Sequence, residues 1–265
     1  MKSIIRNLTI RNLIERLGRL TSLFILEAGG IVLFSLRTIK QLFTMPFDIK
    51  LIILQMLSIG VRSFPVVFIT SIFTGMVFAL QTYTGFKRFG AETMVGSVVA
   101  LSMTRELGPV LTGLIVTGRA GAAIAAEIGT MRVTEQIDAL ETLATNPLKY
   151  LVVPRFLAGL LMLPSLTVLS DIIGINGGFI VSTGIYKMSS SLYWRKVWDY
   201  LELSDFYNGL IKAGFFGASM ALICSYKGFY TEGGAEGVGR ATTQAVVLAS
   251  MTILVSDYFL SAWLF

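Results

Sequence analysis

Five long apolar segments, separated by short polar ones, constrain the fold of this chain more than any other feature. A helix needs about 20 apolar residues to cross a lipid bilayer, and backbone groups in lipid must find their hydrogen bonds within that helix. The sequence therefore predicts an all-α polytopic membrane protein with about five transmembrane helices. We expect them at residues 63–86, 93–118, 156–186, 206–226 and 241–265. The first has an alternative start near Leu51, with Arg62 inside the span.

The composition excludes several classes of protein. Hydrophobic residues make up 54% of the chain and charged residues only 14%, against roughly 25% charged residues in soluble domains. No histidine is present, which removes histidine-based triads, the usual zinc sites and histidine proton relays. The single cysteine, Cys224, lies in an apolar run, so we expect no disulfide framework and no cysteine metal cluster. We therefore expect no catalytic residue, no metal and no cofactor.

Residues 1–50 differ from the remaining region, residues 51–265, because basic side chains are interleaved with apolar ones. This pattern predicts an amphipathic helix lying at the cytoplasmic surface of the membrane. Residues 23–43 are apolar but interrupted by charges such as Glu27 and Arg37, so we expect them to continue this interfacial element. The basic residues are spread too widely for a cleavable signal peptide. The net charge of +6 indicates topology and anionic-lipid contact, not nucleic-acid binding.

The distribution of basic residues predicts the orientation of the chain. With a cytoplasmic N-terminus, thirteen Lys and Arg residues fall in cytoplasmic segments and five in loops on the other side. Basic residues are enriched on the cytoplasmic side of membrane proteins. The N-terminus is therefore expected in the cytoplasm and the C-terminus in the periplasm. The cytoplasmic segments would be residues 1–50, 129–155 and 227–240.

Residues 125–155 form a polar exception between two apolar segments. Within them, Val133, Ile137, Leu140 and Ala144 recur at helical spacing, which predicts an amphipathic helix over 133–144. Asn146-Pro147 is expected to end it. One interpretation is a coupling helix whose apolar face enters a cleft of another protein; the other is an ordinary interfacial helix with its apolar side on lipid. The candidate residues for coupling to such a partner, which the family resemblance described below implies to be an ATPase, are Glu127, Arg132, Glu135, Gln136, Asp138 and Glu141.

Four charged residues lie inside predicted spans: Arg105, Glu106, Lys212 and Asp257. Each costs at least about 2.5–3.5 kcal/mol at bilayer depth, so each should find a partner or a polar cavity. Pro109 has no N–H, which predicts a kink after Arg105. Two interpretations stay open. The charges either form a polar patch beside a lipid cavity, or they are structural ion pairs, with Lys212 and Asp257 as a natural pair.

Several smaller features carry weaker expectations. The spacings Gly174–Gly178 and Gly217–Ala221 permit close helix packing, either in a dimer interface or within one subunit. Arg119 and Glu127 are expected to anchor the end of the second span. Residues 233–239 are rich in glycine but lack the Gly-Lys-Ser/Thr ending of a phosphate-binding loop, so we expect a flexible cytoplasmic turn. With no ATP site expected in the chain, energy must come from a partner.

A series of short motifs resembles the MlaE-type permease family, the membrane subunits of ABC systems that move phospholipids with MCE-domain proteins. The motifs, in chain order, are Arg105–Pro109, Gly118–Gly121, Ala126–Gly129, Met131–Gln136, Pro154-Arg155 and Gly239–Thr243, followed by Asp257 in the last span. Ala125–Gly129 is also similar, more loosely, to the EAA-type loop of ABC importers. The likeness runs from about Val61 to the C-terminus.

The resemblance implies a homodimeric permease in a bacterial inner membrane or a plastid envelope. A separate cytoplasmic ATPase would bind the ATP, and a periplasmic MCE-domain protein would exchange phospholipid at the other face. The chain itself would not be an enzyme. An alternative is an ion-coupled secondary transporter that uses Glu106, Lys212 and Asp257, although no inverted repeat is evident. An intramembrane enzyme is a poorer alternative, since the chain lacks histidine.

Overall fold

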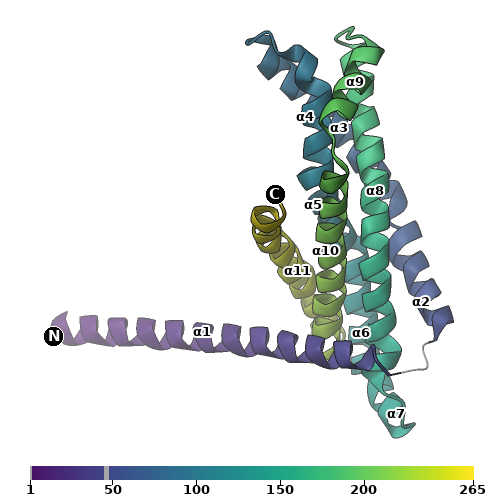
Figure 1. Cartoon of the computed structure of the whole chain (residues 1–265). Helices are drawn as coiled ribbons and strands as arrows, with labels where there is room; N and C mark the ends of the chain where they lie inside the picture. Colours follow the sequence, from purple (N-terminus) through teal and green to yellow (C-terminus); the bar gives the residue numbers. More distant parts are fainter. Residues whose placement is uncertain (1, 45–47) are drawn as a thin grey trace.

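The computed structural model describes residues 2–44 and 48–265, and it is helical throughout this part of the chain, with no strand. Five helical segments in the described residues are long and apolar enough to cross a membrane: Ile49–Lys87, Glu92–Val133, Leu148–Gly184, Leu203–Phe229 and Gly234–Leu264. They pack into one upright bundle (Figure 1). The prediction of an all-α polytopic membrane protein with five spans is confirmed.

Three of the spans are assembled from several helical pieces. The first contains α2 (Ile49–Met56), the π-helical turn η1 (Leu57–Val61) and α3 (Phe64–Lys87). The second contains η2 (Glu92–Met94), α4 (Val95–Ser102), η3 (Met103–Leu107), α5 (Gly108–Val116), η4 (Thr117–Gly121) and α6 (Ala122–Val133). The third contains η5 (Leu148–Val152) and α8 (Val153–Gly184). The last two are the single helices α10 (Leu203–Phe229) and α11 (Gly234–Leu264). Two short helices lie at opposite ends of the bundle, α7 (Gln136–Thr142) and α9 (Ser190–Tyr200).

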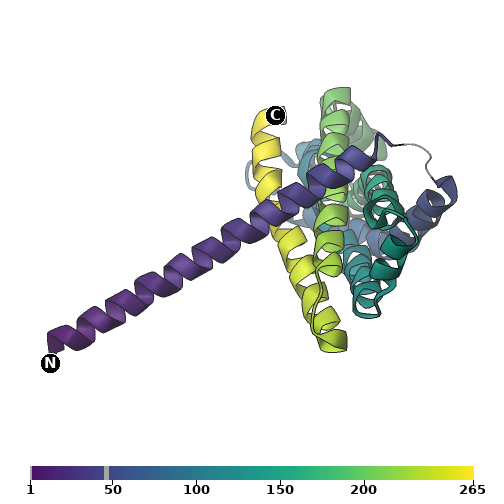
Figure 2. The same cartoon turned by 90° about the horizontal axis from the view of Figure 1, so that it is seen from below.

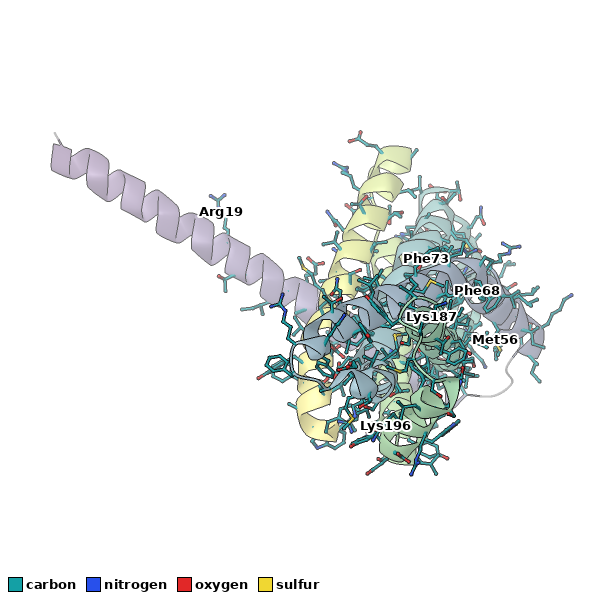
Figure 3. The ribbon with its side chains drawn as sticks, turned by 90° about the horizontal axis from the view of Figure 1, so that it is seen from above. Arg19, Met56, Phe68, Phe73, Lys187 and Lys196 are labelled. Carbon is teal, nitrogen blue, oxygen red and sulfur yellow. The ribbon has the colours of Figure 1, made fainter. Side chains whose placement is uncertain are left out.

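Helix α1 (Lys2–Gln41) is continuous and runs across the same end of the bundle as α7 (Figures 1 and 2). Its second half is held by packing: Phe34 is 3% exposed and lies against the rings of Tyr226 and Phe229. Glu27 also pairs with Lys227. The N-terminal helix thus continues through residues 23–41, and its position at the membrane surface stays a prediction. Figure 3 shows Arg19 on α1, clear of the other helices. The side chains of residues 1–17, 20, 23 and 24 lie outside the described part, so the basic amphipathic face remains a prediction.

The second span is longer than the apolar pattern predicted, because charged side chains find partners inside the bundle. Residues 93–118 were expected, whereas the helix continues to Val133. Arg119 donates to Ser58 O and to Ser63 Oγ, both at 3.0 Å, and so closes the junction between η1 and α3. It does not anchor the end of the span as expected, since the helix continues for fourteen more residues, to Val133.

The loop expected at residues 233–239 is also helical for most of its length. Gly233 takes a positive φ of 88° and α11 begins at the next residue. A Cβ on Gly237 would overlap the carbonyl oxygen of Glu232. These glycines therefore allow a tight entry into α11, and the expected flexible turn was wrong.

Glycines set the closest approaches between spans. A Cβ on Gly75 of α3 would overlap the Gly174 carbonyl of α8, and one on Gly217 of α10 would overlap the Gly159 carbonyl of α8. Gly174, Gly178, Gly217 and Ala221 are all buried within this one chain. Their small size serves packing inside the subunit, which is the second of the two alternatives that the sequence left open.

At the end opposite α7, α9 is fastened to α8 by Tyr193. Its side chain is fully buried and its hydroxyl donates to Ile175 O at 3.0 Å. Burial raises the pKa of Tyr193 well above its usual value, so the phenol stays a protonated donor. Helix α9 is therefore a fixed part of the bundle.

Two substitutions on α3 should separate packing from helix propensity. Gly75→Ala should lower stability by about 1–3 kcal/mol, because the added methyl meets backbone that cannot move aside. Gly85→Ala, on the same helix with nothing within 4 Å of the new Cβ, should be neutral or gain up to about 1 kcal/mol. Thermal unfolding of both variants in detergent measures the difference. Equal unfolding temperatures would contradict the assigned packing.

Candidate functional site

The site is centred on Lys212, a fully buried lysine in the middle of α10. Its Nζ donates to Arg105 O at 2.9 Å, to Glu106 Oε2 at 2.6 Å and to Ser261 Oγ at 2.9 Å. Asp257 Oδ1 completes the shell as an ion-pair partner at 2.6 Å. Residues far apart in the sequence, from η3, α10 and α11, thus meet at one ammonium group. The predicted pairing of Lys212 with Asp257 is present, with Glu106 as a second carboxylate.

The backbone of η3 explains one of these contacts. Pro109 cannot donate the α-helical hydrogen bond to Arg105 O, and the helix adopts a π turn over Met103–Leu107 directly before α5. Lys212 Nζ supplies a donor to that carbonyl. The irregularity predicted at Pro109 is therefore present as a π turn, and the carbonyl of Arg105 becomes an acceptor for a buried cation.

Arg105 and Glu106 face different partners instead of each other. Arg105 pairs with Asp205 at 2.7 Å, and its guanidinium lies 4.9 Å from the ring centroid of Phe265. The sequence analysis missed Asp205, Ser261 and Phe265. A signal was available for Asp205, since Glu202 and Asp205 form a capping box at the start of α10.

The network has a buried half and an accessible half. Lys212 and Asp205 have side chains 0% and 3% exposed, whereas those of Arg105 and Glu106 are 40% and 42% exposed in the single subunit. Two cations face three carboxylates, counting Asp257. Buried charges are tolerated when paired and hydrogen-bonded, so the buried half supports the accessible one. Arg105 and Glu106 are thereby held in place with part of each side chain open to the surroundings of the subunit.

The polar segment at residues 125–155 is folded differently from its prediction. α6 continues to Val133, Glu135 takes a left-handed φ of 59°, and α7 spans only Gln136–Thr142. Asn146 does not end α7; its Oδ1 accepts from Leu148 N at 3.0 Å and caps the next helix. The expected single helix over 133–144 was therefore wrong, since the left-handed residue breaks it and Asn146-Pro147 begins a new one.

The apolar face of α7 packs on the protein itself. Ile137 is fully buried in the core cluster and Leu140 packs against it. Both interpretations had placed this face outside the subunit, and that part of them was wrong; a coupling role for α7 stays a prediction. The exposed side chains of α7 and its flanks include the polar Glu135, Gln136, Asp138 and Glu141, together with the apolar Leu143 directly after the helix.

Two ion pairs fix this segment to the spans. Arg132 at the end of α6 pairs with Asp138 of α7 at 2.6 Å. Glu127 pairs with Arg155 of α8 at 2.8 Å, and the buried Arg155 also donates to Leu151 O. Arg132 and Glu127 thus have structural contacts, while α7 projects beyond the end of the bundle (Figure 1).

Comparison with known proteins identifies the family. The model of the family described as Permease MlaE matches residues 52–263. The chain belongs to the MlaE permease family. It is 50% identical over 256 residues to a probable ABC transporter permease protein of Rickettsia felis, covering 96% of this chain and 98% of the relative.

More distant family members carry more specific names. The intermembrane phospholipid transport system permease protein MlaE of Haemophilus influenzae is 39% identical over 259 residues, covering 97% of this chain and 98% of that protein. The chloroplastic protein TRIGALACTOSYLDIACYLGLYCEROL 1 of Arabidopsis thaliana is 39% identical over 206 residues, or 78% of this chain and 59% of that protein. The chain is thus a multi-pass membrane protein of an ABC permease family.

Removing the central cation should destabilise the bundle. Lys212→Met leaves Glu106 and Asp257 without their cation, a loss expected to cost about 3–5 kcal/mol. Adding Asp257→Asn should recover part of it. Thermal unfolding in detergent provides the measurement, with the exposed Lys187 changed to Met as the control. Equal stability of the two single variants would argue against the network.

Proposed function

We propose that this chain is the transmembrane permease subunit of an ABC transporter that moves phospholipids between the inner membrane and a periplasmic MCE-domain protein. A separate cytoplasmic ATPase drives it, and the chain itself is not an enzyme. The observation that carries the proposal is α7, a rigidly held helix that projects from the bundle with acidic side chains exposed. The name of the Haemophilus influenzae relative supports phospholipid as the substrate.

The proposed coupling acts through exposed carboxylates. Glu135 and Glu141 are free to meet basic residues of an ATPase, and the ion pair of Asp138 with Arg132 ties that contact to α6. α6 continues through η4 and α5 into η3, the segment that carries Arg105 and Glu106. A displacement of α7 would thus be transmitted along one span to the charge network, since packed helices move as rigid units.

The proposed orientation places α7 and α1 in the cytoplasm and the C-terminus in the periplasm. Both helices lie at one end of the bundle and α9 at the other (Figure 1). The excess of basic residues in the segments of the α7 end supports this assignment. The ATPase would then bind at the α7 end and the MCE-domain protein at the α9 end.

The proposed assembly is a homodimer. Arg105 and Glu106 keep 40% and 42% of their side chains exposed in one subunit, which would be costly against lipid tails. A second copy that encloses a polar-rimmed cavity would remove this cost. The cavity would receive phospholipid, with the accessible half of the charge network near its headgroup.

The docking proposal is tested by charge reversal on α7. Glu135→Lys, Asp138→Lys and Glu141→Lys together should abolish co-purification of the ATPase, because three attractive contacts become repulsive. Glu236→Lys, an exposed substitution at the start of α11, is the matched control and should leave co-purification intact. Unchanged co-purification of the triple variant would refute the coupling role of α7.

Contact among Glu106, Lys212 and Asp257 also favours one alternative, an ion-coupled secondary transporter. Reconstituted vesicles distinguish the two. Lipid transfer should require the ATPase and ATP, and Asp257→Asn should reduce it severalfold without loss of the assembled complex. Transfer driven by a proton gradient in the absence of ATPase would establish the alternative instead.

A further inference from the structure

A cavity that is distinct from the Lys212 network lies near the α9 end of the bundle. It has a volume of about 430 Å³, is open on one side, and is bordered by α8, α9, the start of α10 and Thr104 of η3. Its size falls within the usual range for small-molecule sites, about 300–1,000 Å³. Its walls are mainly apolar, with Trp194, Trp198 and Phe206 among them.

The cavity wall includes an acid that has no partner. Asp171 of α8 is 4% exposed, and its Oδ1 has no hydrogen-bond partner among the described residues. This oxygen lies so close to Gly108 that a Cβ there would overlap it. By contrast, Glu106, Asp205 and Asp257 each have a cation in the described structure. Because Asp171 lines the cavity, a ligand there that carries a positive charge or a hydrogen-bond donor would give this carboxyl a partner.

The other polar groups of the wall narrow the chemistry of that ligand. Glu202 contributes a second carboxylate, which also accepts from the backbone of Asp205 and from Ser204 Oγ, and no Lys or Arg of the described residues lines the cavity. Asn176 uses its amide nitrogen to donate to Ile172 O at 2.7 Å, which leaves its oxygen as an acceptor. The indole rings of Trp194 and Trp198 offer electron-rich faces that attract cations. Carboxylates, an amide oxygen and aromatic faces together favour an ammonium group, and the apolar walls favour an attached hydrocarbon chain.

We propose that this cavity binds the ammonium headgroup of a zwitterionic phospholipid, with Asp171 as its counter-ion. The choice of a phospholipid over another ammonium amphiphile rests on the proposed function. The ligand would share two chain segments with the Lys212 network: Thr104 precedes Arg105, and Phe206 follows Asp205. The Arg105–Asp205 ion pair joins these two segments, η3 and the start of α10, on the side that faces Lys212. A bound headgroup would brace η3 against α10 from the cavity side.

The tryptophans of the chain provide a direct test. The sequence contains three, Trp194, Trp198 and Trp263, and the first two line the cavity. In a Trp263→Phe variant, quenching by brominated phospholipids therefore reports on this region alone. Brominated phosphatidylethanolamine should reach half-quenching at about fivefold lower mole fraction than brominated phosphatidylglycerol, a difference of about 1 kcal/mol. Equal or reversed quenching would overturn the proposal.

Asp171→Asn, made in the same Trp263→Phe background, is the diagnostic variant because it removes the charge with little change of shape. It should abolish the preference between the two lipids, whereas the nearby Ser170→Ala, which keeps the charge of Asp171, should retain it. A preference that survives Asp171→Asn would overturn the role of Asp171. Should Asp171→Asn fail to fold, the comparison of lipids in the parent variant still decides.

A single-chain amphiphile identifies the source of the ammonium. Dodecyltrimethylammonium should relieve quenching by the ethanolamine lipid, and neutral dodecyl maltoside should not; equal relief by both would overturn recognition of ammonium. Protection of the tryptophans by dodecyltrimethylammonium without any preference between the lipids would overturn the phospholipid assignment. Loss of ATP-driven transfer with an intact lipid preference would count against the proposed function and not against this site.

Discussion

A buried ammonium group organises the membrane-embedded half of this protein. Lys212 has no access to solvent, and a charge at bilayer depth persists only where every proton finds an acceptor. The acceptors come from η3 and α11, so these elements must pack against α10 in one register. The need for acceptors around this ammonium group explains several features together. They are the π turn before Pro109, the carboxylates of Glu106 and Asp257 and the hydroxyl of Ser261. The network therefore serves first to fix the packing of these helices. Only its accessible half, Arg105 and Glu106, is open to contact with another molecule.

The two ends of the molecule are connected through the second span. At one end, α7 is held by Ile137 and by the Arg132–Asp138 pair. In the interior, the same continuous segment carries Arg105 and Glu106. A force applied at α7 and a lipid headgroup beside Glu106 would thus act on one chain of packed helices. This connection is what the proposed coupling to a separate ATPase would require of the second span.

The sequence predicted the spans and the intramembrane charges because apolar length and the cost of buried charge are local properties. The partners of those charges were only partly predictable. Asp257 was the evident candidate for Lys212, but Asp205 lies at a span boundary, where its capping-box position indicates a helix start and not a buried ion pair. The α7 segment was harder, since the apolar spacing of Val133, Ile137 and Leu140 fits one helix. A left-handed backbone at Glu135, a non-glycine residue, left no compositional signal.

The π turns of the first three spans have a consequence for helical phase. A π turn closes its hydrogen bonds over five residues instead of four, so it inserts about one residue, or roughly 100° of rotation, relative to a uniform α-helix. The second span contains two such turns, η3 and η4. A face traced at constant angle from α4 therefore does not continue on α5 or α6. Where two relatives differ by one of these turns, equivalent helix faces must be assigned separately before and after the turn.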